Sequence, residues 1–410
     1  MRNNIAQKNI PQGWQEKKLG DVCDIINGST PKRSVSEYWD NASIPWFTVD
    51  DIRNNGRIIN KTNQSITDKA LKETSVKLLP KDSVLLCCTA SLGEVALTKI
   101  PLTTNQQFNG LVSKDKGNLY PYYLFYSAQK LGEGLKSKSG KTTINFLSVG
   151  SLSKEKVLIP PIKEQQKIAE ILGTVDEDIA KTEGLIEATE KLKRGLMQQL
   201  FTHGIGHTKF KETKIGQIPE EWQLIKMKDI CTVRQGLQIA ISQRFTEYEV
   251  GRYKYITLKS IKENIYDYIE SPKQSVICTK DDVLMTRTGN TGVVVTGMEG
   301  VFHNNFFLVD FDRSRVLKNY LVYYFLREDI KKIVLEKAGT TTIPDLNHDA
   351  FYGIDFVIPD LSEQNKITEI LSAVDEKISI NKKLKAKLTK LKKGLMQDLL
   401  NGRVRVNLYK

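Results

Sequence analysis

Polar loops along the chain carry side chains of the kinds that recognise nucleic acids. Arginine reads guanine, and asparagine or glutamine reads adenine, through paired hydrogen bonds in the major groove, whereas lysine, serine and threonine more often contact phosphates. In the first half of the chain the candidates are Thr30, Lys32, Arg33, Thr89, Ser91, Gln106, Gln107, Lys141, Thr142 and Thr143. In the second half they are Arg234, Gln235, Arg287, Asn290, Thr291, Asn304, Asn305, Thr340 and Thr341. Taken singly, each is more simply explained as part of a solvated turn, but as a set on a basic chain they indicate DNA binding.

The overall charge of the chain favours a polyanionic partner. The net charge is +13 at pH 7 and the pI is about 9.2, which is evidence about partners rather than about fold. Nucleic acid is the leading candidate, and an anionic membrane surface is the second. No apolar run approaches the ~20 residues of a membrane-spanning helix, and the N-terminus lacks a hydrophobic signal region. We therefore expect a cytoplasmic protein that binds nucleic acid and no membrane.

Motifs of nucleotide and cofactor chemistry are incomplete in this chain. Residues 134–142 (GLKSKSGKT) resemble a phosphate-binding loop, but five residues separate the glycines, whereas that motif has four. The second half has Thr340 where Lys141 stands. A glycine-rich loop for S-adenosylmethionine is not evident, and Pro160-Pro161 does not follow Asp or Asn, as it would in the loop of amino-methyltransferases. We predict that the chain itself binds no cofactor.

Nuclease and metal chemistry is also poorly supported. Asp360 and Glu363 loosely match a nuclease motif, but the other half has Pro161 at the aspartate position. The five cysteines are odd in number and include no Cys-x-x-Cys pair, which argues against a disulfide framework and a zinc site. His203 and His207 are separated by a segment with two glycines, which argues against a helical pair of ligands. We therefore predict a binding protein with no catalytic centre and no metal.

The elements that must position the polar loops occur twice. Residues 10–15 (IPQGWQ) return as residues 218–223 (IPEEWQ), and residues 159–179 (IPPIKEQQKIAEILGTVDEDI) return as residues 358–378 (IPDLSEQNKITEILSAVDEKI). The offset of about 200 residues is the length of a domain and exceeds the 20–50 residues of a solenoid repeat. The chain is therefore predicted to contain two copies of one unit, each a domain followed by a connector.

Each copy is predicted to contain an α/β domain of roughly 150 residues. Runs of β-branched residues bounded by turn residues are typical of strands, and matching runs occur in both copies. These runs are residues 44–49 and 83–89 in the first copy and residues 253–258 and 282–288 in the second. An aromatic-rich helical stretch follows in each copy, at residues 120–129 and 319–327.

A long helix is predicted after Pro160 and another after Pro359. Apolar residues recur at steps of three and four, so one face of each helix is apolar. The helices are expected to end near Gly204 and Gly402, and about 37 residues give a rod of about 55 Å. The simplest partner of each apolar face is the other helix, in an antiparallel pair with a globular domain at each end. The alternative is that each helix packs on its own domain.

The seam between the two helices is assigned to apolar residues that keep this spacing. They are Ile168, Leu172, Val175, Ile179, Leu196, Ile367, Leu371, Val374, Ile378, Leu388 and Leu395. The same apolar pattern also passes through Leu192, Leu384 and Leu391. Thr182 and Asn381 lie near the seam at equivalent places, where they either fix the register or are solvated.

The predicted fold class is α+β, with two α/β globular domains joined by two long antiparallel helices that form a coiled-coil-like spacer. The predicted boundaries are 1–160 for the first domain, 161–202 for the first helical spacer, 203–217 for a linker, 218–359 for the second domain, 360–402 for the second helical spacer and 403–410 for a C-terminal tail. The C-terminus resembles the start of the linker, and the residues before Ile10 match its end. The organisation is therefore circular, with an internal pseudo-twofold relation.

The second long helix contains a run of lysines without a counterpart in the first. The run consists of Lys382, Lys383, Lys385, Lys387, Lys390, Lys392 and Lys393. It is either a solvated helix face or a stripe that faces phosphates, in which case DNA affinity would depend on salt.

Three repeated segments give the chain a recognisable identity. They are the Ile-Pro-x-x-Trp segment, the proline-led helix start with Glu164-Gln165 and Glu363-Gln364, and the Gly-Leu-Met-Gln helix end at residues 195–198 and 394–397. As a set they resemble the specificity (S) subunit of type I restriction-modification systems. The similarity covers the whole chain, as two target-recognition domains that alternate with two helical conserved regions.

The resemblance implies a non-catalytic subunit that binds double-stranded DNA at a bipartite site, with one half read by each target-recognition domain and the helix pair as a ruler. It also implies two methyltransferase (M) subunits bound to this chain, and restriction (R) subunits with translocase and nuclease activity that join this core. Those partners would supply S-adenosylmethionine chemistry on adenine and ATP hydrolysis with Mg. Because the loops differ between the copies, with Ala90-Ser91 against Gly289-Asn290, we predict an asymmetric site.

Three other interpretations remain open at this point. A type II (IIB-like) specificity subunit would serve a partner that carries both activities, and the neighbouring genes would identify it. A fused methyltransferase or nuclease with an unrecognised motif would bind S-adenosylmethionine or methylate DNA by itself. A coiled-coil scaffold that binds only protein would have no sequence-dependent affinity for DNA.

Overall fold

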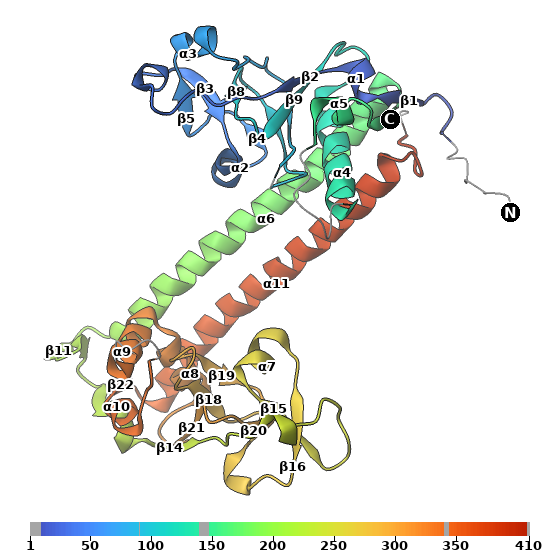
Figure 1. Ribbon diagram of the computed structural model, residues 1–410. Helices are drawn as coiled ribbons and strands as arrows, with labels where there is room; N and C mark the ends of the chain where they lie inside the picture. Colours follow the sequence, from blue (N-terminus) through green and yellow to red (C-terminus); the bar gives the residue numbers. More distant parts are fainter. Residues whose placement is uncertain (1–9, 90, 139–146, 340–343, 408–410) are drawn as a thin grey trace. The chain divides into compact units, whose positions relative to one another are not determined.

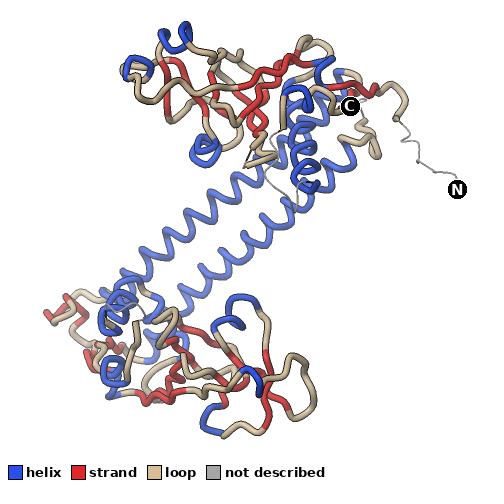
Figure 2. The backbone as a smooth tube through the Cα atoms, viewed as in Figure 1, coloured by secondary structure: helices blue, strands red, loops and turns tan. Residues whose placement is uncertain are grey.

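The chain folds into two compact units of mixed α/β structure. The computed structural model describes residues 10–89, 91–138, 147–339 and 344–407 of the chain (Figure 1). Unit 1 consists of Met1–Glu183 together with Lys383–Lys410, and unit 2 is Gly184–Lys382. Figure 2 shows helices and strands in both units. The predicted mixed fold with an internal repeat is confirmed.

Unit 1 is built around a five-stranded sheet in the order β2-β9-β6-β7-β4. All pairs in it are antiparallel except β4 with β7. The strands are β2 (Cys23–Asn27), β4 (Ile58–Ile59), β6 (Val84–Cys87), β7 (Val95–Thr98) and β9 (Phe108–Ser113). Strand β6 is buried on both faces: Val84 and Leu86 contribute to one apolar core, and Leu85 and Cys87 to another. The alternating directions of side chains in a strand explain this division.

Two smaller sheets and five short or medium helices complete the domain in unit 1. The strands are β3 (Ile44–Phe47), β5 (Gln64–Ile66) and β8 (Thr103–Thr104) in one sheet, and β1 (Gln15–Lys18) and β10 (Lys156–Ile159) in the other. The helices are α1 (Leu19–Val22), α2 (Val49–Asn55), α3 (Asp68–Glu73), α4 (Pro121–Lys138) and α5 (Val149–Leu152), and one 3-10 turn covers Ser36–Tyr38. The aromatic-rich stretch predicted to be helical is the first part of α4.

Unit 2 repeats this plan with a four-stranded sheet in the order β14-β21-β18-β19. Its strands are β14 (Cys231–Gln235), β18 (Val283–Thr286), β19 (Val294–Thr296) and β21 (Phe306–Phe311). A second four-stranded sheet contains β15 (Arg252–Ile256), β16 (Asp267–Glu270), β17 (Ile277–Cys278) and β20 (Gly300–Phe302). Two-stranded sheets join β11 (Phe210–Thr213) to β12 (Gly216–Pro219) and β13 (Gln223–Lys226) to β22 (Asp355–Ile358).

One helix of unit 1 corresponds to two helices in unit 2. They are α7 (Leu258–Glu263), α8 (Lys318–Leu326), α9 (Glu328–Ala338) and α10 (His348–Tyr352), with 3-10 turns at Met227–Asp229, Ile241–Gln243 and Gln274–Val276. The helical stretch that is continuous as α4 in unit 1 is divided here into α8 and α9. The break falls at Arg327, whose backbone is extended.

The two long helices are α6 (Ile162–Thr202) and α11 (Leu361–Leu399), and each contributes residues to both units. In unit 1, Lys385 Nζ lies 2.7 Å from Glu183 Oε1, and Lys392 Nζ lies 2.6 Å from Asp176 Oδ1. Residue numbers rise along one helix as they fall along the other, so the pairing is antiparallel. In unit 2, Lys382–Glu190 and Lys193–Asp375 give the same direction. The antiparallel packing expected from the sequence is confirmed.

Burial along the helices is strongest where they meet the domains. Ile168 and Leu172 are fully buried in the core of unit 1, and Ile367 and Leu371 in that of unit 2. The remaining seam assignments are buried or half-buried: Val175, Ile179, Leu196, Val374, Ile378, Leu388 and Leu395. Thr182 and Asn381 are buried, which excludes the solvated alternative for both. Leu192, Leu384 and Leu391, which the seam assignment leaves out, are exposed.

The lysine run on α11 fits neither interpretation as a whole. Lys382, Lys385 and Lys392 form ion pairs with carboxylates of α6, so they belong to the contact between the helices. Lys383 and Lys387 lie on the exposed side of α11. The sequence alone does not distinguish these two sets, because the register of the helix pair decides which lysines meet α6.

A carboxylate at the start of each long helix holds the segment that opens each domain. In unit 1, Glu164 accepts a hydrogen bond of 3.1 Å from Trp14 Nε1, and the guanidinium of Arg405 donates to the same carboxylate at 2.7 and 2.8 Å. In unit 2, Glu363 accepts from Trp222 Nε1 at 2.9 Å and from His207 Nε2 at 2.9 Å.

The two basic partners of these carboxylates come from different parts of the chain. His207 lies in the linker between the copies, and Arg405 lies in the C-terminal tail. Each is three residues beyond a glycine with a positive φ, Gly204 (63°) or Gly402 (64°), a conformation that commonly ends a helix. The C-terminal tail therefore does in unit 1 what the linker does in unit 2, as the circular organisation predicts.

The next residue in each helix, a buried glutamine, also makes the same contacts in both copies. Gln165 Nε2 donates to the carbonyls of Asn118 and Pro160, both at 2.8 Å, and Gln165 Oε1 accepts from Tyr120 N at 2.8 Å. In unit 2, Gln364 Nε2 donates to the carbonyls of Arg315 and Pro359, and its Oε1 accepts from Leu317 N. Each glutamine thus fixes the segment before α4 or α8 against a long helix.

A third repeated contact joins the domain to both long helices. Tyr126 Oη donates to Asp176 Oδ2 at 3.0 Å, and Lys392 Nζ pairs with the same carboxylate. In unit 2, Tyr323 Oη donates to Asp375 Oδ2 at 2.9 Å, and Lys193 Nζ pairs with Asp375. We call these three repeated contacts, at Trp–Glu, Gln and Tyr–Asp–Lys, the shared framework.

Candidate nucleic-acid interface

The candidate loops of unit 1 meet at one end of its five-stranded sheet. Strand pairing places Asn27 opposite Asn109, Cys87 opposite Phe108, and Leu86 opposite Val95. The chain therefore leaves β2, turns between β6 and β7, and enters β9 at the same end of the sheet. Sheet topology brings together loops that are far apart in sequence.

Contacts between two of these loops are close and specific. Ser29 N donates to Thr104 O at 2.9 Å, and Thr30 Oγ1 donates to Gln106 Oε1. A Cβ atom on Gly28 would lie 2.1 Å from Asn105 O, so only glycine allows this approach. The two loops form one surface, with Lys32, Arg33 and Gln106 exposed on it.

The third loop of unit 1 joins the same surface through backbone contacts. Cys88 N donates to Gln107 O at 2.8 Å, and the side-chain amides of Asn105 and Gln107 are 3.2 Å apart. Thr89 and Ser91 are half-buried beside them. Their hydroxyls are partly accessible, but the loop presents less side chain to solvent than the Lys32–Arg33 segment does.

Unit 2 gathers its candidate loops in the same way. Gln235 is opposite Phe307, Thr286 is opposite Phe306, and Met285 is opposite Val294. These pairs place the end of β14, the turn after β18 and the turn before β21 at one end of the sheet. The loops that carry the candidates thus occupy equivalent positions in the two domains, with different side chains.

Hydrogen bonds tie the loops of unit 2 to one another. Gln235 Nε2 donates to Asn304 O at 3.3 Å, and Asn304 Nδ2 donates to Gln238 Oε1 at 3.0 Å. Thr288 Oγ1 donates to Asn305 Oδ1 at 3.0 Å. Arg234 and Asn290 are exposed at the margin, and Arg234 Nη1 donates to Ser275 O at 3.2 Å.

Two predicted contact residues of unit 2 have structural roles. Thr291 is only 5% exposed, and its hydroxyl donates to the carbonyls of Arg287 and Pro344. Its assignment as a DNA contact is wrong, because the polar loop that carries it folds inward. Arg287 is held differently: its Nη2 lies 2.7 and 2.8 Å from the two carboxylate oxygens of Asp345, so its charge is already matched.

Five of the predicted residues lie outside the described part of the chain. They are Lys141, Thr142, Thr143, Thr340 and Thr341. Conversely, sequence analysis missed residues that support the candidates, namely Trp39, Trp46, Gln64 and Gln238. No local pattern identifies them: Trp46, Gln64 and Gln238 meet their partners from other segments of the chain, and Trp39 meets Arg33 only because their shared loop folds back.

Burial shifts the pKa values of four thiols and one histidine in the two units. Burial raises the pKa of the Cys23, Cys231 and Cys278 thiols to about 12 and that of Cys88 to about 11, so these thiols are protonated at neutral pH and poorly nucleophilic. Burial, with the positive charge of Arg244, lowers the pKa of His303. Among the described residues, no group of three or more His, Cys, Asp or Glu side chains is arranged to hold a metal ion.

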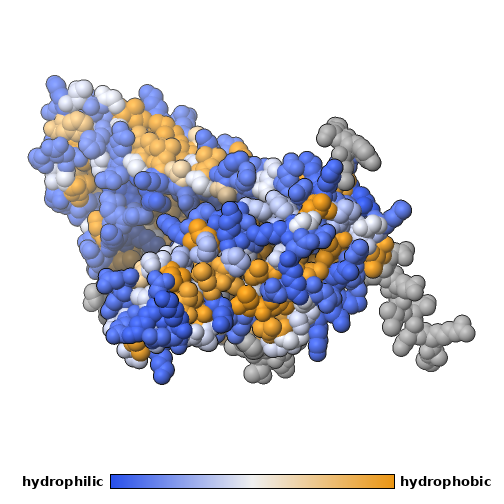
Figure 3. Space-filling model, turned by 90° about the horizontal axis from the view of Figure 1, so that it is seen from above, coloured by the Kyte–Doolittle hydropathy of each residue, from blue (hydrophilic) through white to orange (hydrophobic). Residues whose placement is uncertain are grey.

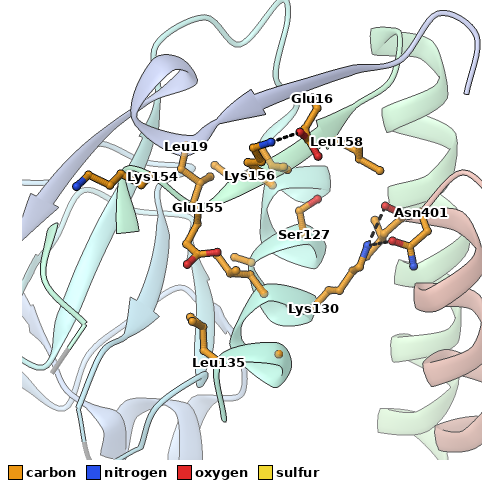
Figure 4. A pocket seen from close by; sticks show the side chains of 16 residues that line it. Glu16, Leu19, Ser127, Lys130, Leu135, Lys154, Glu155, Lys156, Leu158 and Asn401 are labelled. Atoms are coloured by element: carbon orange, nitrogen blue, oxygen red, sulfur yellow. Dashed lines mark hydrogen bonds and ion pairs between the residues drawn. The ribbon is translucent and has the colours of Figure 1, made fainter. Parts of the chain in front are cut away.

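A groove of about 400 Å³ opens in unit 1 beside α4. Figure 4 shows Lys130 directed toward Asn401 and Lys156 toward Glu16; Lys130 Nζ donates to Leu400 O at 3.0 Å, and Lys156 Nζ pairs with Glu16. Neither histidine nor cysteine lines the groove.

On the face that Figure 3 shows, apolar patches lie among hydrophilic side chains. In the described part of the chain, no helix combines the length and the apolar character needed to cross a bilayer.

The repeated domain, its polar loops and the helix pair define a known class of protein. The family model described as "Type I restriction modification DNA specificity domain" matches residues 11–191 and again residues 219–390. The chain therefore belongs to the family of type I restriction-modification specificity subunits, with two DNA-recognition domains. Specificity subunits are the non-catalytic DNA-recognition components of these systems.

Individual relatives agree with this assignment, and the match with one of them covers nearly the full length. The specificity subunit of the type I restriction enzyme MjaIX from Methanocaldococcus jannaschii is 30% identical, over 97% of this chain and 95% of its own. The EcoprrI specificity subunit from Escherichia coli is 36% identical, over 40% of this chain and 42% of its own. The structure of the type I S subunit from M. genitalium matches with a TM-score of 0.58 at 17% identity and covers 98% of both chains.

Proposed function

We propose that this chain reads an asymmetric, bipartite site in double-stranded DNA, one half with each domain, and positions the enzymes that modify or cut that DNA. The recognition domains are residues 1–160 and 218–359, and the helices at 161–202 and 360–402 set the spacing between the two half-sites. The observation that carries the proposal is the repeated cluster of three loops at one end of a sheet, with different side chains in each copy.

The asymmetry follows from the loops. Gln106 and Gln107 in the first domain stand where Asn304 and Asn305 stand in the second, and their hydrogen-bond partners differ. Amides read adenine at base edges, and the length and anchoring of each amide decide which base it reaches. Two domains that present different groups read different half-sites.

The helices provide a basis for binding two copies of one partner. Leu185 and Leu192 on α6 are 45% and 55% exposed, and Leu384 and Leu391 at the equivalent positions of α11 are 43% and 50% exposed. Residues seven apart lie on one face of a helix, and exposed apolar patches of this kind mark interaction sites. We assign these two leucine pairs to contacts with two methyltransferase subunits.

The partners supply the chemistry in this proposal. The methyltransferase subunits bind S-adenosylmethionine and methylate adenine, and the restriction subunits hydrolyse ATP with Mg and join through the methyltransferase core. A related chain, 16% identical with a TM-score of 0.63, comes from work on complex assembly in a type I restriction-modification system.

The decisive experiment is co-expression with the modification partner, followed by mapping of methylated adenines in the host genome. We expect one bipartite, non-palindromic motif with a fixed spacer. A palindromic motif would contradict the proposal that the two domains read different half-sites. Methylation by the purified chain alone would favour a fused enzyme, and cleavage by the modification partner itself would identify a type II system.

The partner contacts can be tested separately. Leu192→Glu or Leu391→Glu should each leave a complex with one methyltransferase subunit, and the double variant should leave none, as measured by native mass spectrometry. Ile380→Glu is the matched control, because Ile380 is equally exposed but has Lys181 at the equivalent position of α6. Loss of partner binding in the control alone would refute the assignment.

A further inference from the structure

We infer that Arg33 is the residue of the first recognition domain that reads guanine, and that two tryptophan rings orient its guanidinium before DNA binds. The inference rests on the proposed DNA-reading function and names the base type that one residue selects. Four observations lead to it: the loop is fixed, the guanidinium is oriented, its charge is not neutralised, and the other described arginines of the domain are engaged elsewhere.

The loop that carries Arg33 is anchored on both sides. Gly28 N donates to Phe108 O at 3.0 Å and Ser29 N donates to Thr104 O, which ties the loop to the sheet end. The indole N–H groups of Trp46 and Trp39 donate to the carbonyls of Ser29 and Lys32, both at 3.2 Å. The backbone on the N-terminal side of Arg33 is therefore positioned by the rings that also meet its side chain.

The guanidinium of Arg33 lies against those rings. Its Cζ is 3.7 Å from the centroid of the Trp39 ring and 4.8 Å from that of Trp46. The two rings meet edge to face, 5.2 Å apart at 87°. Cation–π contact with tryptophan is favourable, and a stacked guanidinium keeps its planar set of donors in one orientation.

Only part of the donor set of Arg33 is used within the domain. Nη2 donates to Gln64 Oε1 at 2.7 Å, which fixes rotation of the group about its axis. No carboxylate among the described residues pairs with Arg33, and the residue is exposed. The charge and the remaining donors are available to a ligand.

The other described arginines of this domain are committed elsewhere. Arg53 pairs with Asp50 at 3.0 Å, and Arg57 pairs with Glu94 at 2.8 Å. In the second domain, Arg287 is held by Asp345. Arg33 therefore combines a place on the loop surface, a fixed orientation and an unmatched charge.

Guanine is the base that this arrangement fits. An arginine fork donates two parallel hydrogen bonds to O6 and N7 of guanine in the major groove. Orientation before binding reduces the side-chain entropy that is lost when both hydrogen bonds form. A phosphate would accept the same donors, so the experiment must separate base reading from charge attraction.

The test uses the complex with the modification partner and maps methylated sites for Arg33→Lys and Arg33→Gln. Both variants should lose preference for guanine at one position of one half-site, with discrimination reduced about ten- to a hundredfold. The other half-site is an internal control and should not change, because its reading domain is intact. Arg53→Gln is the matched control for loss of an exposed arginine.

Trp39 provides a second test as a positioning residue. Trp39→Leu removes the stacking surface but leaves Arg33 in place, so the same guanine preference should relax while the rest of the motif remains. Thermal unfolding of each variant checks that the domain is folded. A merely structural role would weaken all positions of the half-site together.

Two outcomes would overturn the inference. If Arg33 contacts a phosphate, Arg33→Lys will keep the motif, and Arg33→Gln will weaken binding to all sequences and lower the salt slope by about one. If both variants keep the wild-type motif and affinity, Arg33 contacts no DNA. In contrast, a wild-type complex that modifies no bipartite site would refute the proposed function itself.

Discussion

The two copies of the domain agree where they meet the long helices and differ where they present their loops. Trp14 and Trp222 donate to equivalent glutamates, and Gln165 and Gln364 bind equivalent carbonyls, at distances within a few tenths of an ångström. At the other end of each domain, the loops share positions but few side chains. Positions that hold the domain on the helices are constrained by buried polar groups, which must all be paired. Many loop positions at the end of a sheet are exposed, such as Lys32, Arg33, Arg234 and Asn290, and carry no such constraint.

A second difference between the units lies beside α4, where the side chains at equivalent positions differ in size although the shared framework is the same. In unit 2, Phe201 packs against Tyr320 and Tyr324 with ring centroids 4.9 and 5.9 Å apart. Tyr123 and Tyr320 donate to equivalent carbonyls, so the two residues occupy equivalent positions. Four residues further along the chain, Ser127 therefore corresponds to Tyr324. At the end of the long helix, Leu400 corresponds to Phe201. Smaller side chains leave the groove in unit 1 that Figure 4 shows.

The largest loss of stability in one unit relative to the other is expected from replacing the tryptophans of the shared framework. Trp222 and Trp14 are 1% and 5% exposed, and replacing either by alanine should destabilise its own unit by about 3–5 kcal/mol. Hydrogen exchange resolves the two units and should show faster exchange in the mutated one. The conservative variant Trp222→Phe, which keeps a ring but loses the bond to Glu363, should cost about 1–2 kcal/mol. Equal exchange in both units after a single change would contradict the comparison.

A smaller loss is expected from the buried glutamines. Gln165→Leu leaves Tyr120 N and two carbonyls without their partner, and Gln364→Leu does the same in unit 2, so each should cost about 2 kcal/mol. Urea unfolding monitored by exchange in each unit measures the cost. Gln198→Leu, at an exposed position of α6, is the control and should be nearly neutral. A large difference between the two copies would show that the framework is not equivalent.

Exchanging the residues at the groove should give effects of unequal size. Phe201→Leu removes ring contacts with Tyr320 and should destabilise unit 2 by about 1–2 kcal/mol. Leu400→Phe adds atoms beside a groove of about 400 Å³ and should leave unit 1 at least as stable as before. Thermal unfolding of both variants checks this. If Leu400→Phe destabilises unit 1 by as much as Phe201→Leu destabilises unit 2, the groove is not the space left by the missing ring.

The smallest effect concerns the lysines of α11. Lys385→Gln removes an ion pair with Glu183, in which the side chains are 42% and 46% exposed, so the cost should be below about 0.5 kcal/mol and should vanish at high salt. Lys383→Gln removes a charge on the exposed face and should not affect stability. A salt-independent loss at Lys385 would mean that its alkyl chain, rather than its charge, stabilises the helix pair.

Sequence analysis predicted the parts of this molecule that repeat. The duplicated Trp, Glu and Gln positions and the apolar spacing of the helices indicated the copies, the long helices and their antiparallel pairing. It did not predict which lysines meet α6 or that Leu192 and Leu391 are exposed, because both depend on how one helix is rotated against the other. At the interface, the burial of Thr291 and the contact between Trp39 and Arg33 were not predicted. Both depend on how a loop folds, which leaves no pattern in the local sequence.

The division of unit 1 into two stretches of chain affects the order in which the two units can be completed during synthesis. Unit 2 is one continuous segment, Gly184–Lys382, whereas unit 1 needs Lys383–Lys410 to join Met1–Glu183. Met396, Leu399 and Leu400 belong to its core, and Arg405 pairs with Glu164. The domain that leaves the ribosome first is thus the last to be completed. A ribosome that stops just after Lys382 would release a chain in which unit 2 is whole and unit 1 lacks its final buried residues.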